Sequence, residues 1–82
     1  KPAYVMRIDF GELGVKMSSA QLTENYSPEK LVGMQITAVV NFPSKRIAGI
    51  QSEVLVLGAL DENEGTVLLE TERVVQNGVK IA

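Results

Sequence analysis

The sequence predicts an all-β fold: one small domain, residues 1–82, whose short strands curl into a closed or partly open barrel with one short helix. Residues 4–10 alternate apolar and polar side chains, a period of two that is typical of a half-buried strand. Gly, Pro, Asn and Asp recur between the apolar segments and predict turns. The helix signal is too short for a βαβ unit, and five or six strands are too few for a sandwich.

In the first half of the chain we expect two strands and the helix. The strand at 4–10 leads into a hairpin loop at residues 11–14, and a return strand begins at residue 15 and runs into the polar residues 18–21. Residues 27–33 predict a helix of about two turns. Ser27 is suited to cap it, Pro28 to occupy its first position, and Gly33 to end it.

In the second half, the nearly continuous apolar run at residues 34–42 predicts a strand buried on both faces. Residues 43–46 read as a basic loop, and Gly49 adds another break. We expect a second buried strand at 53–60, an acidic turn at 61–65 and a strand at 66–69. The dipeptide Asn77-Gly78 predicts a tight turn before a last short strand at 79–81.

Composition excludes most catalytic chemistry. The chain has neither His nor Cys, so it lacks the usual zinc ligands, the Ser-His-Asp triad and a Cys nucleophile. We therefore expect a protein that is not an enzyme and uses no metal or cofactor. Without cysteine there is no disulfide framework, which favours a cytoplasmic location. No apolar run approaches the roughly 20 residues that span a bilayer.

Charge is distributed unevenly along the chain. Residues 1–52 carry six basic and four acidic side chains, whereas residues 53–82 carry two basic and six acidic ones. The net charge is −2, while general nucleic-acid binders are usually strongly basic. Any RNA binding should therefore be weak or use two copies of the surface.

Five blocks of sequence, in this order, identify the chain more specifically than the periodicity of its apolar side chains does. They are Ser-Ser-Ala-Gln-Leu at 18–22, Tyr-Ser-Pro-Glu-Lys-Leu-Val-Gly at 26–33, Val-Val-Asn-Phe-Pro at 39–43, Arg-Ile-Ala-Gly at 46–49 and Ser-Glu-Val-Leu-Val-Leu-Gly at 52–58. With these blocks the chain resembles the CsaA-type bacterial secretion chaperones. Those belong to the wider tRNA-binding domain family, which includes appended domains of methionyl-tRNA synthetases.

The resemblance implies a five-stranded barrel of the oligonucleotide/oligosaccharide-binding (OB) type, a homodimer, no cofactor and a cytoplasmic location. It also implies one further strand before Tyr4, so we expect this segment to lack the first strand of the barrel. The chain departs from RNA-binding members, which usually have Ser-Gly at 20–21, Arg at 48 and Gly-Met at 53–54; here these positions are Ala-Gln, Ala48 and Glu-Val. These departures favour the chaperone branch, with unfolded preproteins as partners and tRNA as the alternative.

The candidate peptide-binding residues come from two places in the sequence. Phe42 and Ile47 flank the basic loop, where they either line an apolar groove for unfolded polypeptide or close the end of the barrel. Ser18, Ser19 and Gln21 form a polar patch that either donates hydrogen bonds to an extended peptide or RNA, or faces water.

The candidate RNA-binding residues are mostly basic. Lys45 and Arg46 lie in the expected loop, where they either contact phosphates, steer an acidic client, or are simply solvated. Lys16 would add a further positive charge. Asn41 is interpreted either as a contact or as a cap at the end of a strand, and Ser52 matches a serine of the family.

Overall fold

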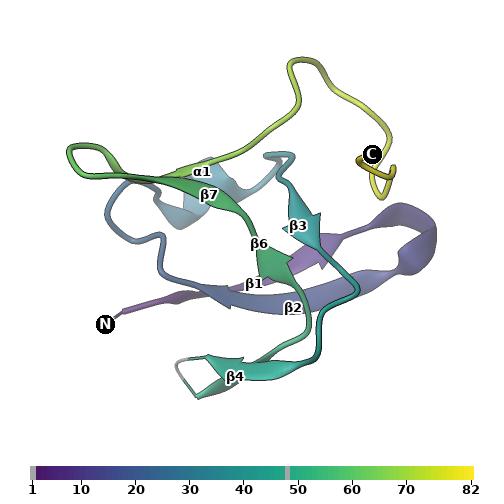
Figure 1. Cartoon of the computed structure of the whole chain (residues 1–82), viewed down its shortest axis with the longest axis horizontal. Helices are drawn as coiled ribbons and strands as arrows, with labels where there is room; N and C mark the ends of the chain where they lie inside the picture. The colour runs from purple at the N-terminus through teal and green to yellow at the C-terminus, as the bar shows by residue number, and fades with distance from the viewer. Residues whose placement is uncertain (1, 48) are drawn as a thin grey trace.

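The fold is mostly β, as expected. The computed structural model describes residues 2–47 and 49–82, and within them it shows eight short strands, one α-helical turn and one 3-10 turn (Figure 1). The strands are β1 (Tyr4–Asp9), β2 (Val15–Ala20), β3 (Ala38–Val39), β4 (Lys45–Ile47), β5 (Ile50–Ser52), β6 (Leu55–Val56), β7 (Gly58–Asp61) and β8 (Gly65–Leu68). The turns are η1 (Gly11–Leu13) and α1 (Pro28–Leu31).

The first hairpin forms where the alternation predicted it. β1 pairs antiparallel with β2 over six residues, from Tyr4 opposite Ala20 to Asp9 opposite Val15. Half-buried and exposed residues alternate along β1, so one face looks inward and the other toward solvent. Gly11 and Gly14 both have positive φ in the connecting loop, a conformation that glycine adopts without steric cost.

The helix also begins where it was expected, although it is shorter. The Ser27 hydroxyl accepts a hydrogen bond from Lys30 N at 3.2 Å, and Pro28 is the first helical residue. The backbone leaves the helix at Val32 after a single turn, and Gly33 follows with a φ of 89°. Tyr26 attaches this segment to β8, because its hydroxyl accepts a hydrogen bond from Leu68 N at 2.9 Å.

The two long buried strands predicted at 34–42 and 53–60 are wrong in extent and in burial: residues 34–42 are half-buried or exposed, and within 53–60 only Val54 is buried. Only Ala38–Val39 of the first segment pairs in a ladder, with β6, while Thr37 bonds to two different neighbours, Leu57 and Leu69. The second segment divides at Leu57, where its partner changes from β3 to β8. Gly58 sits at this division, and a side chain there would meet Thr66 at 2.8 Å. Both segments change partners midway, which residue periodicity does not record.

Two further expectations are corrected. Residues 45–47 form strand β4 of a hairpin with β5, not a loop, because Gly49 (φ 81°) makes the tight turn between them. The turn at Asn77-Gly78 does form, with Gly78 at φ 86°, but residues 79–81 pair with no described strand, so the predicted last strand is wrong.

Among the described residues the strands form four two-stranded sheets, and a closed barrel is not seen. Single backbone bonds join some of these pairs: Glu53 N donates to Met17 O at 2.9 Å, and Thr37 N donates to Leu69 O at 3.1 Å. The buried apolar core is small and consists of Phe10, Leu22, Val54 and Leu68. The sheets therefore curve around a centre that their side chains only partly fill.

Candidate binding surfaces

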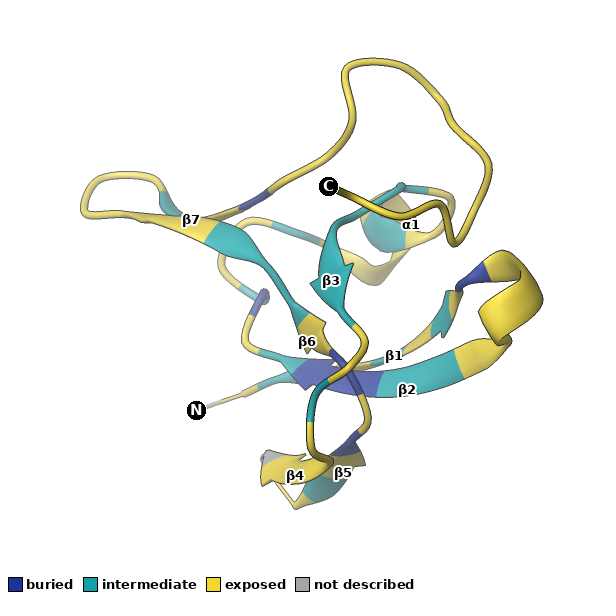
Figure 2. Cartoon of the chain, turned by 45° about the vertical axis from the view of Figure 1, so that its right-hand side comes forward, coloured by how far each residue is buried: buried dark blue, intermediate teal, exposed yellow. Residues whose placement is uncertain are grey.

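The β4–β5 hairpin projects from the body of the molecule and carries both candidate basic residues (Figures 1 and 2). Lys45 and Arg46 are exposed. Because successive residues of a strand point to opposite faces, Lys45 and Arg46 lie on opposite sides of the hairpin and do not form one patch. The Arg46 guanidinium also turns back to donate to Gly49 O at 2.7 Å, which leaves its other N–H groups available.

The neighbouring candidates differ in accessibility. Phe42 is half-buried at the base of the hairpin, and Asn41 beside it is exposed. The backbone of Ile47 lies in β4 opposite Ile50, but its side chain and the whole of Ala48 lie outside the described residues. Of these neighbours, Asn41 is therefore fully accessible and Phe42 partly so.

The three candidate serines are buried together where β2 meets β5. Ser18, Ser19 and Ser52 retain 1%, 4% and 0% of their surface, and Figure 2 shows this stretch of β2 as buried. The Ser52 hydroxyl accepts from Ser19 N at 3.2 Å and lies 3.0 Å from Val54 O and 3.3 Å from Ser18 Oγ. The Ser18 hydroxyl also donates to Val54 O at 3.3 Å.

This burial changes the interpretation of the serines. They join β2 to the segment after β5, so they have no surface to offer to a peptide or to RNA. Gln21, just beyond β2, is exposed and keeps its candidate role, and Lys16 is half-buried on β2. Ser19 Oγ has no hydrogen-bond partner among the described residues. The sequence could not distinguish this polar cluster from a solvated patch, because serine is common in both.

Glu53 also joins β2 to the segment that follows β5. Its carboxylate accepts from Met17 N at 2.8 Å, and its own N–H donates to Met17 O at 2.9 Å. The side chain therefore extends the backbone pairing of β2 by one bond. The sequence had identified Glu53 only as part of a departure from the Gly-Met pair of RNA-binding members.

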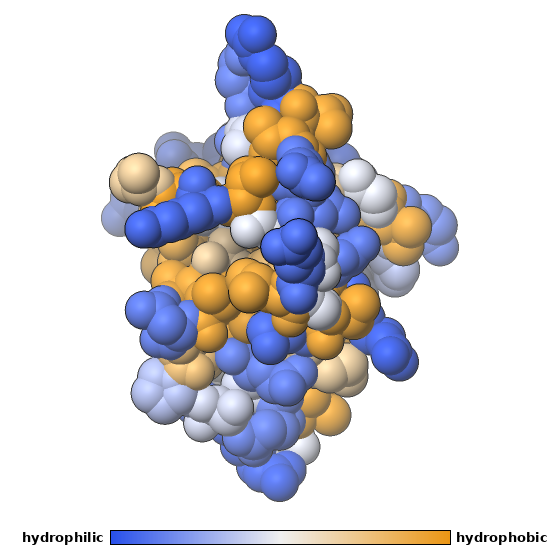
Figure 3. Space-filling model, turned by 90° about the vertical axis from the view of Figure 1, so that its right-hand side faces the viewer, coloured by the Kyte–Doolittle hydropathy of each residue, from blue (hydrophilic) through white to orange (hydrophobic). Residues whose placement is uncertain are grey.

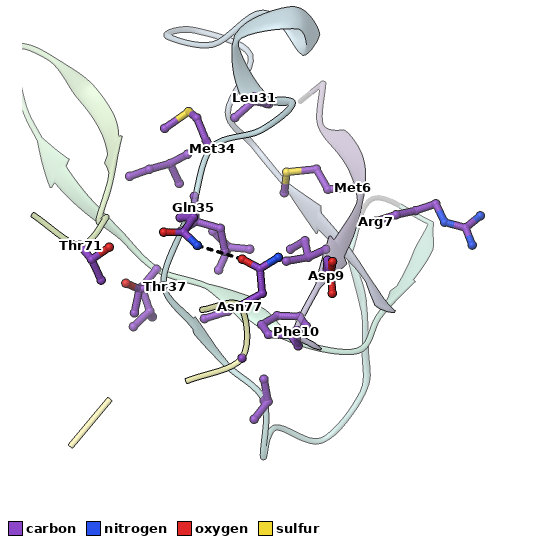
Figure 4. A pocket seen from close by; sticks show the side chains of 18 of the residues that line it. Met6, Arg7, Asp9, Phe10, Leu31, Met34, Gln35, Thr37, Thr71 and Asn77 are labelled. Atoms are coloured by element: carbon purple, nitrogen blue, oxygen red, sulfur yellow. Dashed lines mark hydrogen bonds between the residues drawn. The ribbon is translucent and has the colours of Figure 1, made fainter. Parts of the chain in front are cut away.

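A groove of about 1230 Å³ opens among the described residues. Its walls include the inward side chains of β1 and the apolar residues that follow α1, among them Met6, Ile8, Leu31, Met34 and Ile36. Figure 4 shows Met6, Met34 and Leu31 around this space, and Figure 3 shows apolar surface gathered around a hollow on one side of the molecule. An apolar concavity of this kind is typical of a binding site.

Gln35 holds the C-terminal segment across this groove. Its amide donates to Val75 O at 2.6 Å and to Asn77 Oδ1 at 2.9 Å, the bond drawn in Figure 4, and its oxygen accepts from Val75 N at 3.1 Å. All residues from 69 to 82 are exposed, so these bonds and the Thr37 N to Leu69 O bond fix the segment without burying it. No sequence pattern identified Gln35, because its partners lie about forty positions away.

The described residues show little that resembles a reactive centre. They contain no group of three or more acidic side chains that could hold a metal ion. The carboxyl of Asp61 accepts hydrogen bonds from the backbone N–H groups of Glu64 and Asn63, which lowers its pKa below the usual value, but it lies in an exposed turn. No described helix is both long enough and apolar enough to span a membrane.

Residues 1–80 match the family described as "Putative tRNA binding domain". The chain belongs to this family. Its sequence is 58% identical to that of chaperone CsaA from Bacillus anthracis str. Ames, and its structure matches the crystal structure of that protein with a TM-score of 0.93. The match covers 99% of this chain and 77% of that chain. The CsaA chaperone protein from Picrophilus torridus is 51% identical with a TM-score of 0.90, covering 100% of this chain and 75% of that chain.

Methionine–tRNA ligases are also similar to the chain. The ligase of Methanococcoides burtonii is 29% identical over 76 residues, which is 93% of this chain and 11% of the ligase. The chain thus spans about a tenth of the length of the curated relatives that it matches. The expected resemblance to CsaA-type chaperones and to the tRNA-binding domain family is confirmed.

Proposed function

We propose that this chain is a chaperone module that binds unfolded or precursor polypeptides before export, without catalysis. The observation that carries the proposal is its 58% identity and TM-score of 0.93 to a CsaA chaperone over nearly its whole length. The departures from RNA-binding members at positions 20–21, 48 and 53–54 support the same branch. In this proposal the barrel is of the OB type, the protein works in the cytoplasm as a homodimer, and it needs no cofactor.

The surface that contains Phe42 is our candidate for the polypeptide contact, and the exposed Gln21 is a second candidate residue. Phe42 offers a half-buried aromatic ring and Gln21 an exposed amide, a combination that suits an extended chain with mixed side chains. In a homodimer two such surfaces engage one long client, and the second contact then profits from the high effective concentration that the first creates.

The test measures how well the protein suppresses aggregation of a reduced, unfolded precursor protein. Phe42→Ser is expected to weaken suppression while circular dichroism shows an unchanged fold. Ser44→Ala, in the same exposed loop, is the matched control and should suppress aggregation as well as the unchanged chain. Equal activity of the Phe42 variant would contradict the proposed contact, and failure of the unchanged chain to suppress aggregation would contradict the chaperone function.

A second candidate function is tRNA binding, favoured by the match of residues 1–80 to the tRNA-binding domain family and by the similar ligases. Lys45, Arg46 and Asn41 are the exposed candidates for contact with the phosphate backbone. Binding of this kind weakens steeply with salt, whereas apolar binding of polypeptide does not. Comparing tRNA with an unfolded precursor at about 50 and 200 mM salt therefore separates the two functions.

A further inference from the structure

Asn77 is the one asparagine of the sequence that precedes a glycine. The backbone nitrogen after an asparagine can attack the carbonyl carbon of its side chain and close a succinimide ring, and a side chain on the attacking residue hinders the approach. Gly78 has no side chain and has a φ of 86°, in a turn that Val79 N closes by donating to Gln76 O at 3.3 Å. Within the described residues Gly78 N donates to no acceptor, so this nitrogen is available for the attack.

Gln35 places a hydrogen-bond donor on the carbonyl that would be attacked. The oxygen of its amide accepts from Val75 N at 3.1 Å, which fixes the orientation of the amide. Its nitrogen therefore faces Asn77 Oδ1, at 2.9 Å (Figure 4). As Gly78 N attacks, negative charge develops on this oxygen, and a donor that is already in place stabilises the charge. Gln35 thus favours closure of the ring.

The reaction needs only water besides the chain. Gly78 N forms a bond to Asn77 Cγ and loses its proton, and the side-chain nitrogen leaves with that proton as ammonia. Water then opens the succinimide at one of its two carbonyls, which gives aspartate or isoaspartate. Asn77 and Gly78 are exposed and line a cleft of about 620 Å³ together with Phe10 and Gly11, so water reaches the ring.

The two products affect the turn differently. Aspartate keeps the backbone unchanged, and its carboxylate still accepts the bond from Gln35. Isoaspartate directs the backbone through the former side chain and so adds one carbon between residues 77 and 78. The backbones have no room for it, because a carbon on Gly78 would overlap Phe10 O. A carbon on Gly11 would likewise overlap Asn77 O. The isoaspartyl turn therefore separates from the loop after β1.

Few other contacts hold the C-terminal segment. All residues from 69 to 82 are exposed. Among the described residues, the hydrogen bonds that join this segment to the rest of the chain are those of Gln35 and the bond from Thr37 N to Leu69 O. Residues 75–81 also line the groove of about 1230 Å³. Release of the turn would therefore remove part of the groove wall.

We propose that Asn77 is a site of spontaneous deamidation, promoted by Gly78 and Gln35, and that its isoaspartyl product detaches residues 75–81 from the groove. The modification changes the chain with age and needs no second protein. It does not depend on the proposed chaperone function, because each step uses the turn, Gln35 and water alone.

The first test stores the chain in mildly alkaline buffer and identifies deamidated residues by peptide mapping with mass spectrometry. Asn77 is expected to react before Asn63, the matched control, which is also exposed in a turn but precedes a glutamate. Gln35→Glu keeps an acceptor for Val75 N but has no donor for Asn77 Oδ1. Circular dichroism should show an unchanged fold for this variant, and its reaction should be slower by about twofold to tenfold, which corresponds to the loss of one hydrogen bond.

Amide hydrogen exchange then tests the release. Labelling with an isoaspartyl methyltransferase identifies the isoaspartyl chain, which chromatography separates. Its Val75 amide should lose protection, whereas Asn77→Asp, which has the aspartyl product with a normal backbone, should keep it. The inference is overturned if Asn77 reacts no faster than Asn63, or no faster than it does in Gln35→Glu. It is equally overturned if Val75 has the same protection in the unmodified and isoaspartyl chains, or if Asn77→Asp loses this protection too.

Discussion

Replacing Ser52 by Ala should destabilise the fold strongly for so small a change. Ser52 is fully buried, and its hydroxyl accepts a hydrogen bond from Ser19 N at 3.2 Å while lying 3.0 Å from Val54 O. The methyl group of alanine fills most of the same space but can neither accept nor donate a hydrogen bond. The seam between β2 and the segment after β5 loses its central link.

The magnitude follows from the groups left without partners. A buried donor or acceptor that loses its partner costs about 1–3 kcal/mol. Ser19 N loses its acceptor completely, whereas Val54 O keeps the Ser18 hydroxyl at 3.3 Å. We therefore expect the free energy of unfolding to fall by about 2 kcal/mol. At about 4–8 °C per kcal/mol for a domain of this size, Tm should fall by about 8–16 °C.

Urea unfolding followed by circular dichroism measures this difference, and an unchanged m value confirms that only stability has changed. The matched control is Ser44→Ala, an exposed serine in the loop before β4, which should shift stability by less than about 0.5 kcal/mol. If Ser52→Ala is as stable as this control, the hydroxyl cluster does not hold the seam.

Three other predictions concern the surface. Ser27→Ala removes the helix cap and should cost about 1 kcal/mol in urea unfolding; an unchanged midpoint would contradict this. If tRNA binds, replacing Lys45 and Arg46 together by Ala should reduce the slope of the logarithm of the tRNA association constant against the logarithm of the salt concentration by about 1–2. An unchanged slope would show that neither side chain contacts a phosphate. The lowered pKa of Asp61 means that its carboxylate stabilises the fold above the ordinary Asp pKa and that this stabilisation is lost as pH falls through the lowered value. Asp61→Asn should therefore weaken the acid dependence of unfolding, and an unaltered pH profile from pH 2 to pH 5 would refute this.

Local chemistry made several elements predictable. The alternation at residues 4–10 predicted β1 and its half-buried face, because side chains of a strand point alternately to its two sides. Ser27 and Pro28 predicted where the helix begins, since capping depends on residues adjacent in sequence. The expected loop at residues 43–46 was wrong for residues 45 and 46, because a hairpin depends on the pairing of β4 with β5 as well as on its turn.

The candidate site was harder to predict. The sequence identified Lys45, Arg46 and Phe42 as a cluster, but strand geometry separates the two basic side chains onto opposite faces. It also treated the serines at 18 and 19 as surface groups. Burial of a hydroxyl depends on which segment covers it, and here that segment, around Ser52, is more than thirty residues away.

By itself the sequence determined the class of the fold, the start of the helix, the first hairpin and the absence of His and Cys chemistry, because each depends on residue type or on neighbours within a few positions. The tertiary structure alone decided which strands pair, which serines are buried, and that Gln35 holds the C-terminal segment beside an open groove. Those features depend on contacts between distant segments, and the energy of such contacts belongs to the pair of segments rather than to either one.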